Sequence, residues 1–110
     1  MEIRATAKGV GVSPKKVRRI IGMIQGKSAD EALAILKFTP TPTARSISRV
    51  VKSAVANAEN NYHMSPSELK VTKAFANEGQ RMKRVRFAGR GRISPIIKRS
   101  SHITVVVEEI

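Results

Sequence analysis

The 110-residue sequence contains no cysteine and no tryptophan, and it has few aromatic and acidic residues. The absence of cysteine excludes disulfides, thiolate zinc sites and cysteine nucleophiles, and it fits a reducing compartment. The longest apolar run is five residues, from Ala32 to Leu36, whereas a membrane-spanning helix needs about 20. Residues 1–8 lack the apolar core of a secretory signal. We therefore expect one domain over residues 1–110, neither spanning a membrane nor secreted by that route.

Basic residues are what the sequence has in excess. Lys and Arg total 21 against 8 Asp and Glu, which gives a net charge of +13. Such a charge repels itself unless a polyanion neutralises it, and nucleic acid is the first candidate, with an anionic membrane surface second. The net charge is segregated: +6 in residues 1–27, +1 in 28–79, +8 in 80–100 and −2 in 101–110. The two basic segments are therefore the expected sites of polyanion contact.

Three helices are predicted between residues 13 and 62. The pair Ser13-Pro14 predicts the start of the first, with the Ser13 hydroxyl as its cap, and Gly26 predicts its end. Ser28 to Glu31 match a capping box at the start of the second. The third is expected from Thr43 to Asn61. The apolar residues that recur at helical spacing, and so predict the buried faces, are Val17, Ile20, Ile21 and Ile24, then Ala29, Ala32, Leu33 and Leu36, then Ala44, Ile47, Val51, Ala54, Val55 and Ala58.

Three strands are predicted around these helices. Residues 2–8 alternate, with Ile3, Ala5 and Ala7 on the buried side. Residues 69–76 favour a strand, residues 103–107 form a β-branched run typical of a central one, and residues 62–67 read as a loop. The predicted class is α+β, with a small, mainly antiparallel β-sheet packed on three α-helices and a long protruding β-hairpin.

The hairpin prediction rests on residues 80–100, which carry eight basic and no acidic residues. Gly89-Arg90-Gly91 supplies the residues that a tight reversal needs. Two arms of about ten residues would each reach roughly 30 Å. A disordered basic tail or a solvated loop is the alternative. Apolar residues interleaved with the charges, and strands at both ends, favour the hairpin.

Basic side chains are the candidate binding residues. On the first helix, Lys15, Arg18 and Arg19 lie opposite the apolar face. One interpretation is that they contact phosphates, and the other is that they form an ordinary solvated helix surface. Because no acidic residue lies between Arg4 and Lys27, we favour RNA contact. The full candidate set is Lys8, Lys15, Lys16, Arg18, Arg19, Lys27, Arg81, Lys83, Arg84, Arg86, Arg90, Arg92, Lys98, Arg99, Ser100 and His102.

Catalysis has little support in the sequence. No carboxylate cluster accompanies His63 or His102, and no nucleophile–base set or phosphate-cradling loop is present. We expect no enzyme activity, no metal and no cofactor. The three asparagines at the end of the third helix, which either contact RNA or cap the helix, are Asn57, Asn60 and Asn61.

Two other classes of function compete with structural RNA binding. A basic module for DNA would use the helix that begins at Ser13 for recognition, but a second helix in turn geometry and dimeric half-sites are missing. A membrane-active cationic peptide would have to expose apolar faces that the predicted core needs. We therefore place RNA first.

Several stretches together resemble one family. They are residues 12–18 (VSPKKVR), 24–27 (IQGK), 32–36 (ALAIL), 53–61 (SAVANAENN), 77–79 (NEG), 82–84 (MKR) and 98–106 (KRSSHITVV). In this order and spacing they resemble the bacterial large-subunit ribosomal protein family called L-twenty-two, over essentially the whole chain.

The resemblance implies a cytoplasmic protein of the ribosome that binds several domains of large-subunit ribosomal RNA and assists assembly. It implies a body near the exit of the nascent-peptide tunnel, beside neighbouring ribosomal proteins, and a hairpin that lines the tunnel. It also implies a nascent peptide near the hairpin tip, macrolide antibiotics close by, and no homo-oligomer. The family tip usually reads PRAKGRA, and the corresponding tip residues here are Phe87, Ala88, Gly89, Arg90, Gly91 and Arg92.

Overall fold

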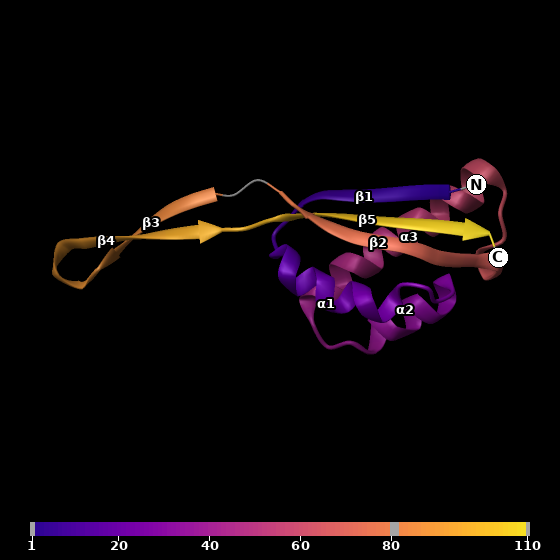
Figure 1. The fold of residues 1–110 in the computed structure, drawn as a ribbon, viewed down its shortest axis with the longest axis horizontal. Coiled ribbons are helices and arrows are strands. Elements are labelled where there is room, and N and C mark those ends of the chain that lie inside the picture. Colours follow the sequence, from indigo (N-terminus) through magenta and orange to yellow (C-terminus); the bar gives the residue numbers. More distant parts are fainter. Residues whose placement is uncertain (1, 80–81, 110) are drawn as a thin grey trace.

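The computed structural model describes residues 2–79 and 82–109, and for 82–88, 90 and 92–98 it describes the backbone alone. The molecule measures 61 × 26 × 17 Å along its principal axes. A body of helices and strands occupies one end, and a two-stranded hairpin projects from it along the long axis (Figure 1). The α+β class predicted from the sequence is confirmed.

A three-stranded antiparallel sheet forms one layer of the body. Its strands are β1 (Glu2–Val10), β2 (Leu69–Glu78) and β5 (Ser101–Glu109), in the order β1-β5-β2. The β-branched run of β5 fits the central position, where both neighbours and the helices exclude water. Ile103 and Val105 are fully buried. The predicted central strand is therefore confirmed.

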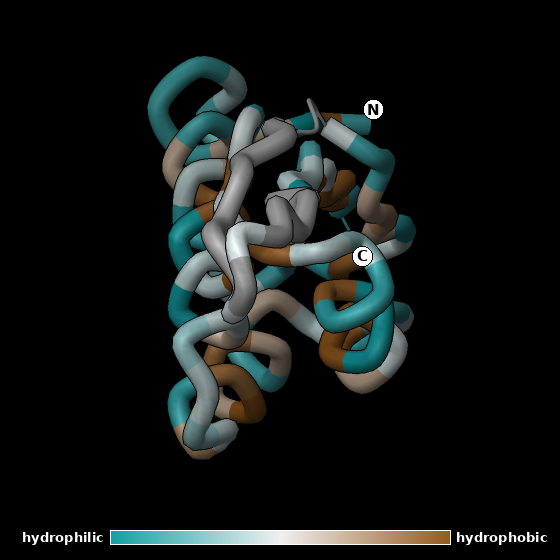
Figure 2. Tube along the Cα trace, turned by 90° about the vertical axis from the view of Figure 1, so that its left-hand side faces the viewer, coloured by the Kyte–Doolittle hydropathy of each residue, from teal (hydrophilic) through white to brown (hydrophobic). Residues whose placement is uncertain are grey.

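Three helices cover one face of this sheet (Figure 1). They are α1 (Pro14–Ile24), α2 (Ala29–Phe38) and α3 (Pro42–Tyr62). The predicted apolar faces are buried, except that Leu33 and Val55 are only partly covered, and Val50 joins the core although it was not predicted. In Figure 2 the hydrophobic colouring gathers toward the interior between the layers. Helical periodicity thus located the core correctly.

Helix ends agree with the sequence in part. The Ser28 hydroxyl accepts a hydrogen bond from the Glu31 N–H at 3.2 Å, so this half of the predicted capping box is present. The Ser13 side chain makes no cap hydrogen bond, and that prediction is wrong. The Ser13 carbonyl accepts hydrogen bonds from the Lys16 and Val17 N–H groups, as the residue before a helix ordinarily does. Gly26 lies just past the end of α1 with φ +83°, as the predicted stop requires.

The segment predicted as a loop after α3 is more structured than expected. Tyr62 is still helical, His63 ends the helix in the left-handed region with φ 54°, and Pro66–Glu68 form a short 3-10 turn. The helix itself extends one residue beyond the predicted Thr43–Asn61 at each end. The loop predicted for residues 62–67 was therefore wrong at Tyr62, and its last two residues form part of a short turn.

The hairpin forms a separate two-stranded sheet. It consists of β3 (Met82–Ala88) and β4 (Arg92–Lys98), joined by a 3-10 turn at Gly89–Gly91. Gly91 has φ +70°, which explains why the reversal uses glycine there. The predicted reversal is confirmed, while the paired arms have seven residues rather than about ten. At about 3.3 Å per residue, each arm extends about 23 Å.

Candidate nucleic-acid interface

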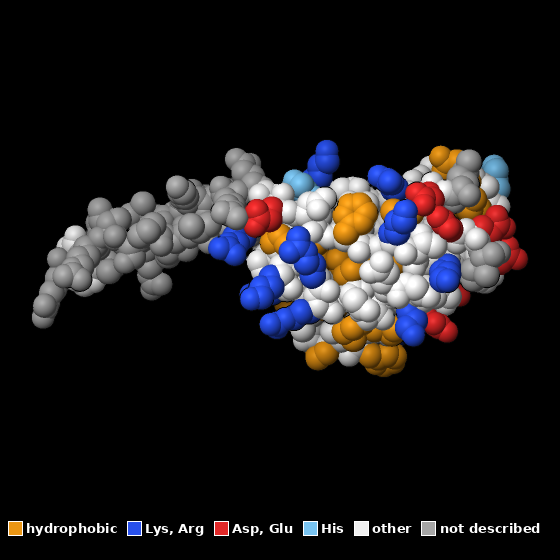
Figure 3. Space-filling view, viewed as in Figure 1, with side chains coloured by type: hydrophobic (Ala, Val, Ile, Leu, Met, Phe, Trp, Pro, Cys, Tyr) orange, Lys and Arg blue, Asp and Glu red, His pale blue; other side chains and the backbone are white. Residues whose placement is uncertain are grey.

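The body has a basic end and an acidic end, set by the register of its sheet. The hairpin leaves the sheet where Ser101 pairs with both Val10 and Glu78. At the opposite end Glu2 pairs with Glu108, and Leu69 pairs with Glu109. In Figure 3 the acidic side chains gather mostly at that far end, whereas basic side chains extend over α1 near the hairpin. Glu78 is the acidic residue at the hairpin end.

Helix α1 presents the densest group of described cations. Burial of Val17 and Ile21 against the sheet turns the opposite face outward. The exposed cations on that face are Lys15, Lys16, Arg18 and Arg19. The helix follows directly after β1, so its first two turns lie at the hairpin end. This places four of the predicted binding residues together.

The start of α1 adds the positive end of the helix dipole to these charges, and this also attracts anions. Its first turn contains no acidic residue, Pro14 has no N–H, and the Ser13 hydroxyl does not cap it. The positive end of the helix dipole is therefore not offset by a carboxylate of its own first turn. The buried Ser101 hydroxyl donates a hydrogen bond to the Val12 carbonyl and fixes this turn against β5. The arrangement favours an anion at this helix end.

Arg18 also has a structural contact. Its Nη2 donates a hydrogen bond to the Ala76 carbonyl on β2 at 2.9 Å. This bond orients the guanidinium along the surface between α1 and the sheet. A guanidinium has five N–H donors, so others remain for a phosphate. The sequence indicated the exposure of Arg18 but gave no sign of this bond.

The neck between body and hairpin, by which we mean Gly79 and Ser100 with the adjoining Gly9 and His102, is closely packed. The Gly79 N–H donates to the Ser100 carbonyl at 2.9 Å, and the Gly9 N–H donates to Nδ1 of His102 at 3.1 Å. A Cβ atom on Gly79 would lie 2.5 Å from the Ser100 hydroxyl oxygen. His102 thus joins β5 to β1, and Arg99 is exposed beside it. These bonds hold together the two chain segments that lead to the hairpin and attach β5 to the end of β1.

The remaining predicted RNA-binding residues are scattered over the body or lie outside the residues that the structure describes. Lys8 is exposed on the hairpin half of β1, and Lys27 lies beyond the other end of α1, where its carbonyl accepts a hydrogen bond from Val71. Arg81 is outside the described residues. Side chains are likewise not described for the hairpin candidates Lys83, Arg84, Arg86, Phe87, Ala88, Arg90, Arg92 and Lys98, while Gly89 and Gly91 are exposed.

The asparagines near the end of α3 attach the helix to β1. Asn57 Nδ2 donates to the Arg4 carbonyl at 3.4 Å, and Asn61 Nδ2 donates to Asn57 Oδ1. Asn57 and Asn61 thus help attach the helix, and the alternative that these asparagines cap it is wrong, because α3 continues to Tyr62 and is capped by His63. RNA contact by the same residues stays a prediction.

Sequence reasoning missed one group of cations. Residues 28–79 have a net charge of only +1, so their basic residues were not singled out. On α3, however, Arg45, Arg49 and Lys52 are all exposed. Their spacing of four and three residues puts them on one helical stripe, and that spacing was the available signal.

Among the residues that the structure describes, no group of three or more His, Cys, Asp or Glu could hold a metal ion. No helix within that part of the chain is long and apolar enough to cross a membrane.

Comparison with known proteins gives a consistent result over nearly the whole chain. The family model described as "Ribosomal protein L22p/L17e" matches residues 5–108. Two proteins named "Large ribosomal subunit protein uL22", from two strains of Dehalococcoides mccartyi, are each 50% identical over 109 residues. The match covers 99% of this chain and 100% of each relative.

Proposed function

Since this chain belongs to the family of Ribosomal protein L22p/L17e, and is thus a structural constituent of the large ribosomal subunit rather than an enzyme, we propose that it binds large-subunit ribosomal RNA through one end of its body and through its hairpin. In this proposal residues 1–110 act as one RNA-binding domain, with 80–100 as its extension. Neighbouring large-subunit proteins complete its surroundings.

The observation that supports RNA binding most strongly is the position of charge relative to shape. The outward face of α1 and the hairpin lie at the same end of the molecule, and the carboxylates of Glu2, Glu108 and Glu109 lie at the other. A polyanion approaching the hairpin end meets cations on both the body and the projection. Repulsion at the acidic end favours one orientation of the protein on the RNA.

Binding uses phosphate contacts more than base reading. Lys15 and Lys16 lie in the first turn of α1, where the helix dipole also attracts an anion. Arg18 and Arg19 add planar guanidinium groups that bind phosphate oxygens in pairs. Contacts of this kind fix register and orientation on RNA without selecting bases. Specificity then comes from the fit of the preformed body.

The hairpin is the part that reaches beyond the body. We propose that it passes between RNA segments and that its tip, from Phe87 to Arg92, lines the nascent-peptide tunnel. The nascent peptide and macrolide antibiotics would then lie near this tip. The proposal is supported by the separate two-stranded sheet, by its extension along the 61 Å axis and by eight basic residues without an acidic one in residues 80–100.

The experiment compares two lysine pairs of equal charge. Lys15→Gln/Lys16→Gln removes two cations from α1, and Lys70→Gln/Lys73→Gln removes two exposed cations from β2, near the acidic end. Binding of the full chain to protein-free large-subunit RNA is measured over a range of salt concentrations. The slope of log K against log salt should become shallower by about 2 for the α1 pair, about 1 per lost phosphate contact, and change less for the β2 pair.

Equal slopes for the two variants would contradict phosphate contact by α1. Duplex DNA is included as a competitor, because a general nucleic-acid module would bind it as well as RNA. Displacement of the RNA by duplex DNA at equal nucleotide concentration would favour that second function.

A further inference from the structure

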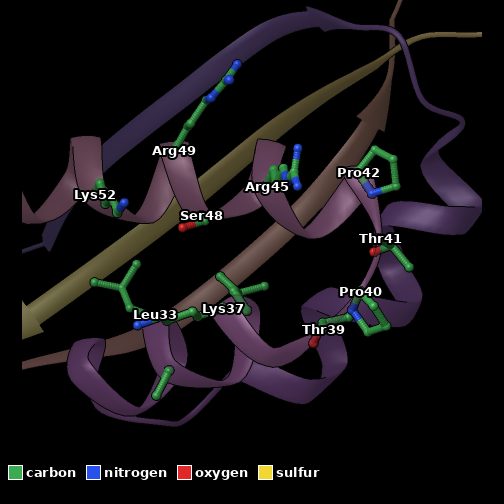
Figure 4. Close-up of a pocket in the computed structure, with 12 residues that line it drawn as sticks. Leu33, Lys37, Thr39, Pro40, Thr41, Pro42, Arg45, Ser48, Arg49 and Lys52 are labelled. Atoms are coloured by element: carbon green, nitrogen blue, oxygen red, sulfur yellow. The ribbon is translucent and has the colours of Figure 1, made fainter.

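A groove of about 910 Å³ lies between α2 and α3, away from the hairpin strands (Figure 4). Helix α2 and the segment that follows it form one wall, and α3 forms the other. Its twelve lining residues include no acidic residue and no aromatic one. Four of them are cations, namely Lys37, Arg45, Arg49 and Lys52. The groove is therefore basic although residues 28–79 are nearly neutral overall.

Packing of α3 holds three of these cations on the surface. Ala44, Ile47 and Val51 are fully buried on the core side of the helix. The opposite stripe, Arg45 to Lys52, is therefore turned outward along about 10 Å of helix. No carboxylate of the described residues forms an ion pair with the four groove cations. Their charge is thus available to a partner.

Arg49 connects this groove to a second one. The Arg49 side chain extends toward β1 (Figure 4), and it also lines a neighbouring groove of about 420 Å³ between β1 and α3. Lys8 lines that second groove. A basic surface therefore continues from Lys37 on α2, across α3, to Lys8 on β1. The length of this surface suits an extended polyanion better than a small anion.

We propose that the α2–α3 groove binds a second stretch of RNA sugar–phosphate backbone, separate from the contacts of α1 and the hairpin. The inference rests on the proposed function, since it assumes that large-subunit RNA is the polyanion. The stripe that carries Arg45, Arg49 and Lys52 extends about 10 Å along α3, so its cations can contact more than one phosphate of the same strand. The body would then hold two RNA segments at a fixed separation.

An acidic protein segment is the alternative occupant, and the lining argues against it. Peptide-binding surfaces rely on apolar or aromatic anchors seated in pockets. Here the apolar wall is shallow and aliphatic, formed by Leu33, Pro40 and Pro42, and such a wall suits the face of a ribose. Ser48 lies between the cations, with its hydroxyl toward the gap (Figure 4).

The first test uses lysine pairs again. Lys37→Gln/Lys52→Gln removes one cation from each wall of the groove and matches Lys70→Gln/Lys73→Gln in residue type and charge. Binding of the full chain to protein-free large-subunit RNA is titrated with salt, after thermal melting has shown that each variant is folded. The groove pair should make the salt slope shallower by about 2, and clearly more than the β2 pair does.

A slope equal to that of the β2 pair would overturn the inference. Lys15→Gln/Lys16→Gln, measured in the same series, separates the two proposals. If the α1 pair lowers the slope and the groove pair does not, only the groove inference fails. If neither does, the proposed function fails with it.

The second test identifies the neighbour inside the particle. Because the chain has no cysteine, Ala34→Cys provides a single attachment point for an iron chelate that cleaves nearby backbones by hydroxyl radicals. Ala34 is exposed on α2 and lines the α2–α3 groove. Large subunits containing this variant should show RNA cleavage that is absent with the unmodified, cysteine-free chain. Cleavage of a neighbouring protein without RNA cleavage would overturn the inference and assign the groove to a protein segment.

Discussion

The body and the hairpin obtain their structure in different ways. In the body, the central segment nearly cancels its own charge, and three strands and three helices bury Ile103, Val105 and the apolar face of α3. The hairpin strands pair only with each other as a sheet, in a segment with eight cations and no acid. An isolated two-stranded hairpin is marginal in water. The comparison indicates that the body is stable through its own core, whereas the hairpin needs a partner.

Removal of the hairpin is the most direct way to break this comparison. In the register of β3 and β4, Met82 faces Lys98, so residues 83–97 can be replaced by Asn-Gly as a two-residue turn. The body should keep its cooperative unfolding transition, since the deleted strands belong to a separate sheet. RNA affinity should fall by orders of magnitude, and the salt slope should become shallower by about 4 to 5 because five cations are lost. Calorimetry and RNA titration measure the two effects.

A second variant, which changes only the charge of the hairpin, separates the effect of its charge from the effect of its length. Changing Lys83, Arg84, Arg86, Arg90 and Arg92 to Gln keeps the length of the hairpin and removes the same five cations. It should reproduce the change in salt slope. Loss of cooperative unfolding in the deletion variant would show that the hairpin supports the body, and the contrast between the two regions would then be wrong.

The neck, where the two regions meet, should be sensitive to a single methyl group. Gly79→Ala places a Cβ atom 2.5 Å from the Ser100 hydroxyl oxygen and 3.3 Å from the Ser100 carbonyl carbon. Rotation of the Ser100 side chain relieves the closest contact, and the neighbouring backbone must give by a few tenths of an ångström, at a cost of about 1 kcal/mol in the free energy of unfolding. Urea unfolding of the full chain measures it.

Gly22→Ala is the matched control for the neck. Gly22 lies in α1, and a Cβ atom there would meet nothing within 4 Å. This variant should raise the free energy of unfolding by up to about 1 kcal/mol, because alanine favours helix more than glycine does. Adding Ser100→Ala to Gly79→Ala should recover part of the loss, as expected for two groups in contact. A fully additive double variant would argue against the proposed clash.

Periodicity in the sequence was enough to predict most of the body. Alternation located β1, the β-branched run located β5, and helical spacing located the buried faces. These signals are local, and burial of one face is the dominant contribution to folding. The reversal at Gly89–Gly91 was predicted for a similar reason, since a tight turn restricts its residues to few types.

Features that depend on packing between distant segments were not predictable. The Ser13 hydroxyl does not cap α1, although the Ser28 hydroxyl caps α2 from the same kind of position, so residue type alone did not decide the cap. The bond from Arg18 to Ala76 joins residues 58 positions apart. The α2–α3 groove brings Lys37 beside α3, and its charge was hidden by carboxylates elsewhere in the same segment. Net charge along the sequence therefore underestimated the basic surface of the body.

The smallest predicted effect concerns the acidic end of the body. At this end an ion pair joins a lysine and a glutamate of the chain itself. Lys73 Nζ lies 3.3 Å from Glu2 Oε1. The hydrogen bond from Lys73 lowers the pKa of Glu2 below its ordinary value of 4.5. A lowered pKa in the folded state means stabilisation that is present above pH 4.5 and lost as the pH falls through the folded value. Glu2→Gln should remove this pH-dependent contribution.

Urea unfolding of the natural chain and Glu2→Gln, between about pH 3 and 6, measures the difference. The free energy of unfolding of the natural chain minus that of Glu2→Gln should be constant in the upper part of this range. It should shrink toward about pH 3, where Glu2 becomes protonated. It should be small, because both side chains are exposed and their interaction is screened by salt. In a Lys73→Gln background the pH-dependent part should be much reduced, since the largest cause of the lowered pKa is gone. If the natural chain were instead the less stable of the two in the upper part of this range, and gained on Glu2→Gln as the pH falls, Glu2 would be destabilised by its neighbours and the acidic end would not balance its own charge.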